Sequence, residues 1–364
     1  MTGLRPARRM RRKTQAAGGR LRGLPLSTLV VVAFGAMAAA CALAAAGCRR
    51  AEDSRPEVVL YTSVDSDVAE PIIAEFERAS GIKVLARFDS EATKTLGLVQ
   101  RLRTETARPV ADVFWSNEIF HTVRLASEGV LAPYESDRTK AWPAAWRDAS
   151  GRWYAFGLRF RVLAYNTKRV SEAEAPGRLE DLLDAKWRGR IAMASPEFGT
   201  TSGHVATWFV LYGPERAREI LEGLKANEVR LASANSTAVR MVATGEADVC
   251  LTDTDDVYAA ERNGWPVAMK FLRHDQAGAL AIPNTAAIVQ GAPHPAEARA
   301  LMAFLLADET ERLLAASGSR NTPVHESVAA EFPTCARPDC MAADYAKAAQ
   351  VAPACVRTAS EILR

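Results

Sequence analysis

The chain has 364 residues, and its 46 basic and 43 acidic residues give a net charge of +3. Eight of the basic residues precede position 23, so the rest of the chain carries 38 basic against 43 acidic residues, a net charge of −5. This charge distribution argues against a nucleic-acid-binding protein. No later apolar run reaches the length of a membrane span, so we expect neither a transporter nor a transmembrane sensor.

Residues 1–47 have the pattern of an export signal. The basic start is followed by an apolar run from Leu26 to Gly47 and by small residues before Cys48. This order predicts a cleaved signal peptide. The apolar run of about 20 residues is also long enough to cross a bilayer, so an uncleaved anchor is the alternative.

The end of this leader, Ala45–Cys48 (AAGC), resembles a bacterial lipobox, whose cysteine is lipidated and becomes the mature N-terminus. Ala45 stands where the motif usually has leucine, and Ala38–Cys41 is a weaker competitor. The resemblance implies a lipid on Cys48, a short charged tether over residues 48–56, and anchoring to a membrane on the periplasmic or extracytoplasmic face of the cell envelope.

Predicted strands and helices alternate along the mature chain. Glycine at position 81 ends the first predicted helix, which begins after Asp65. The other predicted elements are strands at 57–64, 82–88, 111–115, 189–196, 245–253 and 286–290, and helices at 96–105, from about 204 and, as one long amphipathic helix, at 295–315. This alternation predicts an α/β fold with largely parallel sheets, and the length of the mature chain suggests two lobes.

Four cysteines follow the leader. Cys250 lies in an apolar segment and is expected to be buried. The other three are near the C-terminus, where an oxidising compartment would allow one disulfide. We predict a Cys335–Cys340 pair, with Cys355 left over; the histidine and cysteine spacing argues against a zinc site.

Five stretches of the chain resemble the extracellular solute-binding proteins of ABC importers, nearest the ferric-iron-binding branch. They are VVLYTSVDSDVAEPIIAEFERASGIKV, ADVFWSNEIFHTVRLASEGVLAPY, RVLAYNT, GEADVCLTDTDD and IPNTAAIVQGAPHPAEARALMAFLLADE. The match runs from about Glu57 to about Pro323. The resemblance implies a type II periplasmic-binding-protein fold with two α/β lobes, a ligand cleft between them, and a monomer that hands its ligand to an inner-membrane permease.

The resemblance also implies where the lobes divide. Arg161–Asn166 and Ala277–Pro283 resemble the two segments that cross between lobes. Residues 57–163 with about 275–330 then form lobe 1, residues 164–274 form lobe 2, and residues 331–364 form a C-terminal segment that carries the cysteines.

An acidic cluster lies in GEADVCLTDTDDVY, where Asp248, Asp253, Asp255 and Asp256 fall within nine residues. Carboxylates crowded into a low-dielectric cleft raise one another's pKa unless a cation neutralises them. Iron-binding members of the resembled family carry an adjacent tyrosine pair where this chain has Asp255–Asp256. The resemblance also places Asp65 near a histidine ligand, and Ser116–Glu118 near a Glu/Gln pair, of the first lobe.

These residues predict a site for a hard cation, with ferric iron as the first choice, because such cations take oxygen ligands. The predicted metal ligands are Asp65, Glu118, Asp255 and Asp256. The alternative ligand is an organic cation, such as a polyamine or a thiamine-like molecule, with aromatic faces supplied by Tyr61, Trp115, Tyr258 or Trp265. A third interpretation is a solvated turn in which Asp253 or Thr254 caps the following helix.

A possible anion site lies at Thr200–Gly203, between a strand ending near Pro196 and a helix expected to begin near His204. Backbone N–H groups at a helix N-terminus suit an anion, although ordinary capping is the alternative. In ferric-binding relatives the corresponding loop holds an anion such as carbonate or phosphate. The ligand-binding residues that the resemblance implies are Asp65, Trp115, Asn117, Glu118, Thr201, Ser202, Gly203, Asn235, Asp255 and Asp256.

Other polar residues have simpler interpretations. His121 and His204 are alternative metal ligands, but both fall within predicted helices, so we expect them to be exposed or hydrogen-bonded in the core. Arg159 and Arg161, beside the first crossing, are expected to bind a ligand carboxylate, to pair with the acidic cluster, or to form hinge salt bridges. The chain lacks G-x-S-x-G, H-E-x-x-H and glycine-rich phosphate motifs, so we expect no enzyme and no catalytic cofactor; an envelope hydrolase is a minor alternative.

Overall fold

The computed structural model describes residues 55–89, 96–274, 277–335 and 337–364. The predicted export signal, Cys41, Cys48 and most of the tether lie outside these residues. Residues Arg55–Arg364 form one compact unit. Within the described residues, every helix is too short or too polar to cross a membrane.

The first sheet begins with three parallel strands in the order β2 (Lys83–Phe88), β1 (Glu57–Thr62) and β3 (Val113–Ser116). β10 (Ala281–Val289) then pairs antiparallel with β3 and with the short strand β4 (Leu131–Ala132). We call this sheet and its helices the first lobe. Its main helices are α2 (Ser66–Ser80), α3 (Leu96–Thr104), α4 (Phe120–Ser127), α10 (Pro295–Leu305) and α11 (Asp308–Ala316).

The second sheet centres on β6 (Ile191–Ala194), which is parallel to both β7 (Arg230–Ala232) and β8 (Val249–Asp253). β9 (Val267–Phe271) joins it through β5 (Tyr154–Asn166), which pairs with β8 on one side and with β9 on the other. We call this sheet and its helices the second lobe. Its main helices are α6 (Gly199–Tyr212), α7 (Pro214–Ala226), α8 (Asn235–Thr244) and α9 (Thr254–Arg262).

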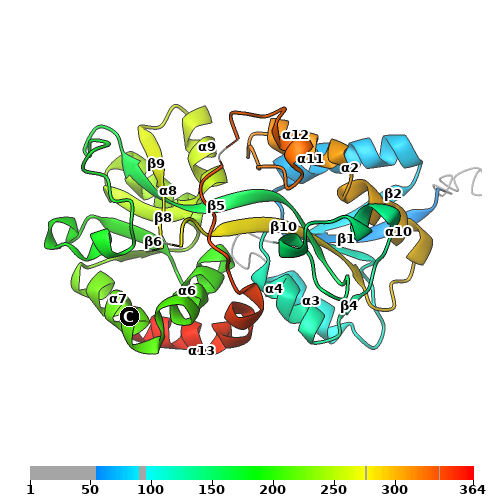
Figure 1. Cartoon of the computed structure of the whole chain (residues 1–364), viewed down its shortest axis with the longest axis horizontal. Coiled ribbons are helices and arrows are strands. Elements are labelled where there is room, and N and C mark those ends of the chain that lie inside the picture. The colour runs from blue at the N-terminus through cyan, green and yellow to red at the C-terminus, as the bar shows by residue number, and fades with distance from the viewer. Residues whose placement is uncertain (1–54, 90–95, 275–276, 336) are drawn as a thin grey trace, which may run out of the picture. The chain divides into compact units, whose positions relative to one another are not determined.

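One long buried strand, β5 (Tyr154–Asn166), belongs to both sheets (Figure 1). Its first half pairs with β10, and its second half, from Arg161 onward, pairs with β8 and β9. Arg159 and Arg161 therefore lie where the strand passes between the lobes. Because side chains two residues apart share one face of a strand, both guanidinium groups point to the same side.

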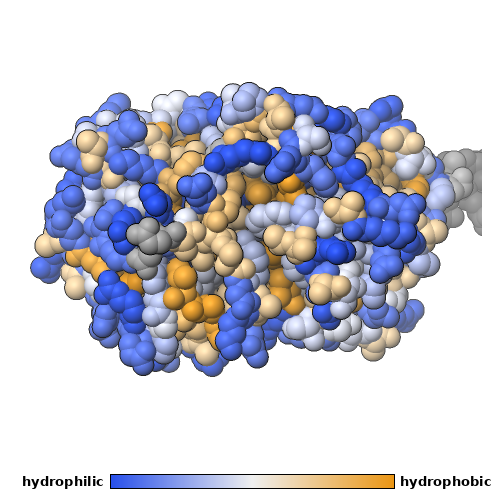
Figure 2. Space-filling model, in the orientation of Figure 1, coloured by the Kyte–Doolittle hydropathy of each residue, from blue (hydrophilic) through white to orange (hydrophobic). Residues whose placement is uncertain are grey.

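The C-terminal helix α13 (Tyr345–Leu363) packs against α6 and α7 of the second lobe and α4 of the first. The ring of Tyr345 lies 5.7 Å from that of Phe120, and its hydroxyl donates to the Ala281 carbonyl over 2.9 Å. Figure 1 shows this helix beside α6 and α4. In Figure 2, apolar side chains gather toward the middle of the visible face, whereas polar ones cover its margins.

Local signals account for most of the element boundaries. Gly81 ends α2, as predicted: it adopts a left-handed conformation (φ 71°), and its amide donates to the Glu77 carbonyl. The strand predicted within Gly189–Pro196 is β6, and the strand predicted within residues 245–253 is β8. Cys250 is fully buried in β8, as expected. The predicted α/β alternation with parallel pairing is confirmed.

Three local predictions are wrong. The helix expected over 295–315 is two helices, α10 and α11, separated by Leu306 and Ala307. The break buries Leu306, and the acidic residues Asp308 and Glu309 then favour a new helix N-terminus. α6 begins at Gly199 rather than near His204.

The predicted disulfide is also absent. Cys335 and Cys340 are free thiols, as is Cys355. The Cys335 sulfur is buried against the Ala315 carbonyl, 3.9 Å away, whereas Cys340 is exposed. The two side chains therefore lie in different environments.

Candidate ligand site between the two lobes

A pocket lies where the two lobes meet at β5. Its polar lining comes from the first lobe, from β5 and from the second lobe, namely Asp65, Asn117, Arg159, Thr200, Ser233, Asn235, Ser236, Asp253, Asp255 and Asp256. Asp65 and Asn117 follow β1 and β3, and Asp253 ends β8. Because these strands are parallel to their neighbours, their carboxyl ends open toward one crevice, where ligands of open α/β sheets bind.

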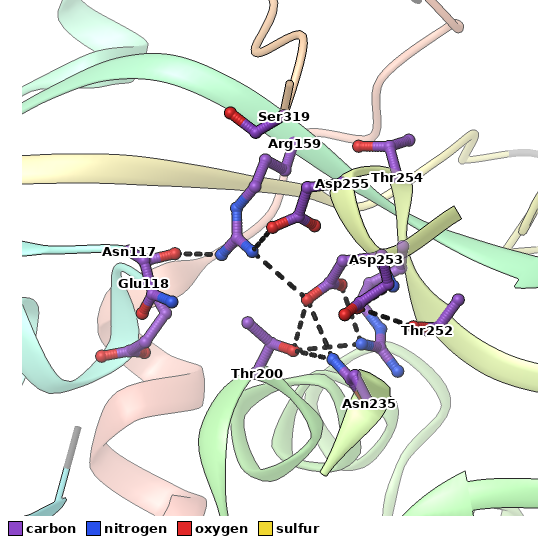
Figure 3. Close-up of polar contacts among 12 residues, drawn as sticks. Asn117, Glu118, Arg159, Thr200, Asn235, Thr252, Asp253, Thr254, Asp255 and Ser319 are labelled. Atoms are coloured by element: carbon purple, nitrogen blue, oxygen red, sulfur yellow. Dashed lines mark hydrogen bonds and ion pairs between the residues drawn. The ribbon is translucent and has the colours of Figure 1, made fainter. Parts of the chain in front are cut away.

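Asp253 is a carboxylate of the pocket with several hydrogen-bond partners (Figure 3). Its Oδ1 accepts from Arg161 Nη1 over 2.8 Å, and its Oδ2 accepts from Thr200 Oγ1 (2.7 Å) and Asn235 Nδ2 (3.0 Å). Burial would raise the pKa of Asp253, but Arg161 and Arg159 outweigh it, and the net pKa is lowered. Asp253 is therefore an ionised, fully partnered residue that holds the second-lobe wall together.

Asp255 and Arg159 form a second ion pair. Arg159 is 5% exposed; its Nη1 donates to Asp255 Oδ2 over 2.8 Å and lies 3.7 Å from Asp253 Oδ2. Its Nη2 donates to the Asn117 carbonyl, so this side chain joins both lobes (Figure 3). Among the described residues, neither Asp255 Oδ1 nor Arg159 Nε has a hydrogen-bond partner.

Burial and mutual attraction shift the pKa of both members of this pair. It raises the pKa of Asp255, and the attraction of Arg159 offsets this only in part. Burial would lower the pKa of Arg159, but the carboxylates of Asp255 and Asp253 more than offset it, so the guanidinium stays charged. The hydrogen-bonding capacity that remains unused is thus a buried carboxylate oxygen of Asp255 beside a charged guanidinium.

Asp256 has a structural partner as well as a place in the pocket. Its Oδ2 accepts from Thr252 Oγ1 over 2.7 Å and from the Asp253 amide over 3.4 Å. With Asp253 as the N-cap, this completes the capping box of α9. The predicted capping by Asp253 is confirmed, but the segment is not a solvated turn, because Asp253 and Thr254 are buried.

Two predicted ligand residues of the first lobe do not reach the pocket. Glu118 is buried and accepts from the amides of Phe120 (2.8 Å) and His121 (3.1 Å), so it satisfies the N-terminus of α4. In Figure 3 its carboxylate lies away from the aspartates. Trp115 is fully buried and packs 6.0 Å from the Phe156 ring. Their predicted roles as metal ligand and ligand-binding residue therefore do not fit the structure.

The predicted anion loop is displaced along the chain. Because α6 begins at Gly199, the residues Thr201, Ser202 and Gly203 lie within its first turns and do not line the pocket. Thr201 Oγ1 donates to Asn235 Oδ1, and Ser202 Oγ donates to the Gly199 carbonyl. The pocket is lined instead by Phe198, Gly199 and Thr200; sequence reasoning had missed Phe198, an N-cap position with no polar side chain.

Two helix N-termini border the pocket. α6 begins at Gly199, and α8 begins at Asn235, which lines the pocket as predicted. Helix N-termini carry unpaired N–H groups and a partial positive charge, so this wall suits an anionic group. The aromatic residues proposed for an organic cation lie elsewhere, because none of Tyr61, Trp115, Tyr258 and Trp265 lines the pocket.

A buried pair of histidines, His204 and His274, is hydrogen-bonded to Arg161 through His204, on the side away from the pocket. Arg161 Nε donates to His204 Nδ1 over 3.2 Å, and His204 Nε2 lies 3.2 Å from His274 Nε2. His274 Nδ1 is in turn 3.2 Å from the Tyr212 hydroxyl. His204 is thus hydrogen-bonded in the core, one of the two roles expected for it. This series of hydrogen bonds links the acidic pocket to the segment that connects β9 with β10.

This pair should make stability depend on pH. Burial, together with Arg161, lowers the pKa of His274 to about 4. In the unfolded chain the pKa of a histidine is about 6.5, so as the pH falls the unfolded state binds the proton before the folded state does. The free energy of unfolding is therefore highest above pH 6.5 and falls by about 3 kcal/mol as the pH drops toward 4. Urea unfolding across this range should show the loss, and His274→Gln should reduce it to the part due to His204, whose pKa burial also lowers. Parallel curves for the two proteins would contradict the assignment.

Comparison with known proteins agrees with this architecture. Residues 108–349 match the family model for the bacterial extracellular solute-binding protein. The chain is 30% identical over 284 residues to the major ferric iron-binding protein of Neisseria meningitidis serogroup B, covering 76% of this chain and 83% of that relative. It is also 30% identical over 224 residues to a putative 2-aminoethylphosphonate-binding periplasmic protein of Salmonella typhi, covering 59% of this chain and 63% of that protein.

Among solved structures, iron-bound HitA from Pseudomonas aeruginosa is similar, with a TM-score of 0.73, 28% identity, and coverage of 84% of this chain and 99% of that one. The expected two-lobed type II fold is therefore confirmed, and this chain is a solute-binding protein rather than an enzyme. The envelope hydrolase alternative is set aside on the same grounds. The chain belongs to the bacterial extracellular solute-binding protein family.

Proposed function

We propose that this protein captures ferric iron together with an anion in the pocket between its lobes, and delivers it to the permease of an ABC importer. The observation that carries the proposal is that one pocket holds both carboxylates, which suit a cation, and helix N-termini, which suit an anion. Carboxylates of Asp65, Asp255 and Asp256 line it beside the N-termini of α6 and α8. A relative that is named for ferric iron and a similar structure that is named as iron-bound support the same ligand.

The carboxylates are arranged for a cation to bridge them. One ligand atom from each of Asp253, Asp255 and Asp256 lies within 4.8 Å of the others. Asp255 Oδ1 lacks a partner among the described residues, and Asp65 of the first lobe lines the same pocket. Hard trivalent and divalent cations prefer such oxygen ligands. Carboxylates would then replace the tyrosines that the ferric-binding resemblance leads one to expect.

The lipid anchor belongs to the same proposal. A lipid on Cys48 would hold the binding protein at the membrane that carries its permease, with residues 48–56 as the tether. This part of the proposal rests on the lipobox-like motif AAGC at Ala45–Cys48. Mass spectrometry of the membrane-extracted protein tests it, because a lipidated Cys48 adds acyl mass to the N-terminal peptide.

The iron proposal is tested by metal content. The protein from residue 49 onward is made in a periplasm, purified without chelators, and measured by native mass spectrometry with elemental analysis. Asp255→Ala with Asp256→Ala should lower the affinity for ferric citrate by about 30-fold or more, because losing charged partners in a buried site costs roughly 2 kcal/mol or more.

The matched control is Asp137→Ala, which removes a fully exposed carboxylate on α5 (Asp137–Lys140). It should leave the bound metal unchanged. Equal metal content in the double variant and the native protein would contradict the proposed site.

A second ligand is favoured by one specific observation. Asp255 Oδ1 offers an acceptor for an ammonium group close to the helix N-termini that suit an anion. An aminoalkylphosphonate carries both groups, and one relative is named for such a ligand. Calorimetry with 2-aminoethylphosphonate in the presence of a chelator separates the two ligands: binding without metal supports the zwitterion, whereas metal-dependent binding supports iron.

A further inference from the structure

The buried guanidinium of Arg159 already occupies one oxygen of Asp255. Arg159 Nη1 lies 2.8 Å from Asp255 Oδ2 and 3.7 Å from Asp253 Oδ2. Its side chain is 6% exposed and that of Asp255 is 18% exposed. The acidic cluster therefore contains its own cation before any ligand arrives, and an incoming cation has to share Asp255 with it or displace it.

Displacement without replacement is costly. Breaking a buried ion pair leaves a charge with neither water nor a partner, and this is strongly unfavourable. A guanidinium cannot lose its proton to relieve the cost, because its pKa lies far above neutrality. A bare cation at Asp255 would therefore deprive Arg159 of its 2.8 Å partner, leaving only the more distant Asp253 carboxylate, or would be repelled by it at short range.

A ligand that brings its own negative group removes this cost. Arg159 Nε is buried and has no partner among the described residues, so the guanidinium has one unused donor. Arg159 lines the same pocket as Gly199, Thr200 and Asn235 at the starts of α6 and α8. An anion there would meet the guanidinium and the helix N-termini together, while the positive centre meets Asp255.

Arg161 does not share this role. It is fully buried, and it donates to Asp253, Thr200 and His204, so its contacts lie within the second-lobe wall and its supporting histidines. Arg161 does not line either pocket that borders Arg159. Of the two arginines on this face of β5, Arg159 is the one placed to meet a ligand.

We propose that Arg159 determines the specificity of the site: it acts as a resident counterion that excludes bare cations and admits only ligands whose positive centre is paired with a negative group. The inference rests on the proposed function in placing the ligand at Asp255. It covers both a metal–anion complex and a zwitterion, which share this charge pairing.

The test uses Ca²⁺, a redox-inert cation that binds carboxylates, as the probe. Calorimetry in a buffer without coordinating anions should find no saturable Ca²⁺ binding to the native protein. Arg159→Gln should bind Ca²⁺ at least about tenfold more tightly than the native protein, and Arg159→Gln with Asp255→Asn should lose this gain. Arg159→Lys, which keeps a cation, should behave like the native protein.

Ferric citrate and 2-aminoethylphosphonate test the opposite expectation, for ligands that carry a negative group. Each that binds the native protein should bind Arg159→Gln more weakly, because the anion loses its buried partner. Circular dichroism and melting curves check that the variants are folded. A purely structural Arg159 would lower the melting temperature of Arg159→Gln without creating Ca²⁺ binding.

The outcomes separate the two proposals. Saturable Ca²⁺ binding by the native protein, or an Arg159→Gln variant that gains none, overturns the role of Arg159 even if iron is bound through the aspartates. Undiminished ligand binding after Asp255→Ala and Asp256→Ala overturns the proposed site, whatever Ca²⁺ does.

Discussion

Arg161→Met should lower the free energy of unfolding by about 3–5 kcal/mol, one of the largest effects expected for a single substitution in this protein. The guanidinium is fully buried, with Nη1 2.8 Å from Asp253 Oδ1 and 3.1 Å from Thr200 Oγ1. Methionine fills similar space but leaves Asp253 without its main buried cation. Urea unfolding, followed by circular dichroism, measures the loss.

A double-mutant cycle isolates this ion pair. Asp253→Asn alone should also destabilise, and the double variant should lose less than the sum of the two single losses, because each single change leaves a buried charge uncompensated. Arg78→Met is the matched control, since Arg78 pairs with Glu75 on an exposed surface of α2. A loss from Arg161→Met no larger than that from Arg78→Met would refute the assignment.

Gly203→Ala should destabilise the protein by about 1–3 kcal/mol through overpacking. This reverses the usual effect, because alanine stabilises a helix interior by about 1 kcal/mol relative to glycine. A Cβ at position 203 of α6 would lie 1.9 Å from the Phe120 ring of α4. The glycine therefore allows a second-lobe helix to approach a first-lobe helix, and thermal unfolding measures the effect of closing that space.

Gly223→Ala in α7 is the matched control. A Cβ there would lie 2.8 Å from a terminal methyl of Leu183, which can rotate away, so a smaller effect is expected. Combining Gly203→Ala with Phe120→Ala should cost less than the sum of the single changes, because the ring that collides is gone. Additive losses, or a Gly203→Ala variant as stable as the native protein, would show that the α4–α6 contact is not tight.

Local chemistry made the elements and part of the site predictable from the sequence. Alternating apolar patterns and the glycine at position 81 indicated β1, α2 and β2, because a strand period and a helix stop depend on neighbouring residues only. The resemblance and the residue chemistry also selected Asp65, Asn117, Asn235, Asp255 and Asp256, all of which line the pocket. The capping role of Asp253 was readable for the same local reason.

The tertiary structure alone decided which side chains meet. Arg159 and Asp255 are 96 residues apart, and only the crossing of β5 between two sheets brings them to 2.8 Å. The same packing turns Glu118 toward the amides of α4, buries Trp115 and sets Gly203 against Phe120, which removes all three from the pocket. Sequence patterns report which residues a segment offers; burial and long-range pairing determine which of their charges are already neutralised before a ligand binds.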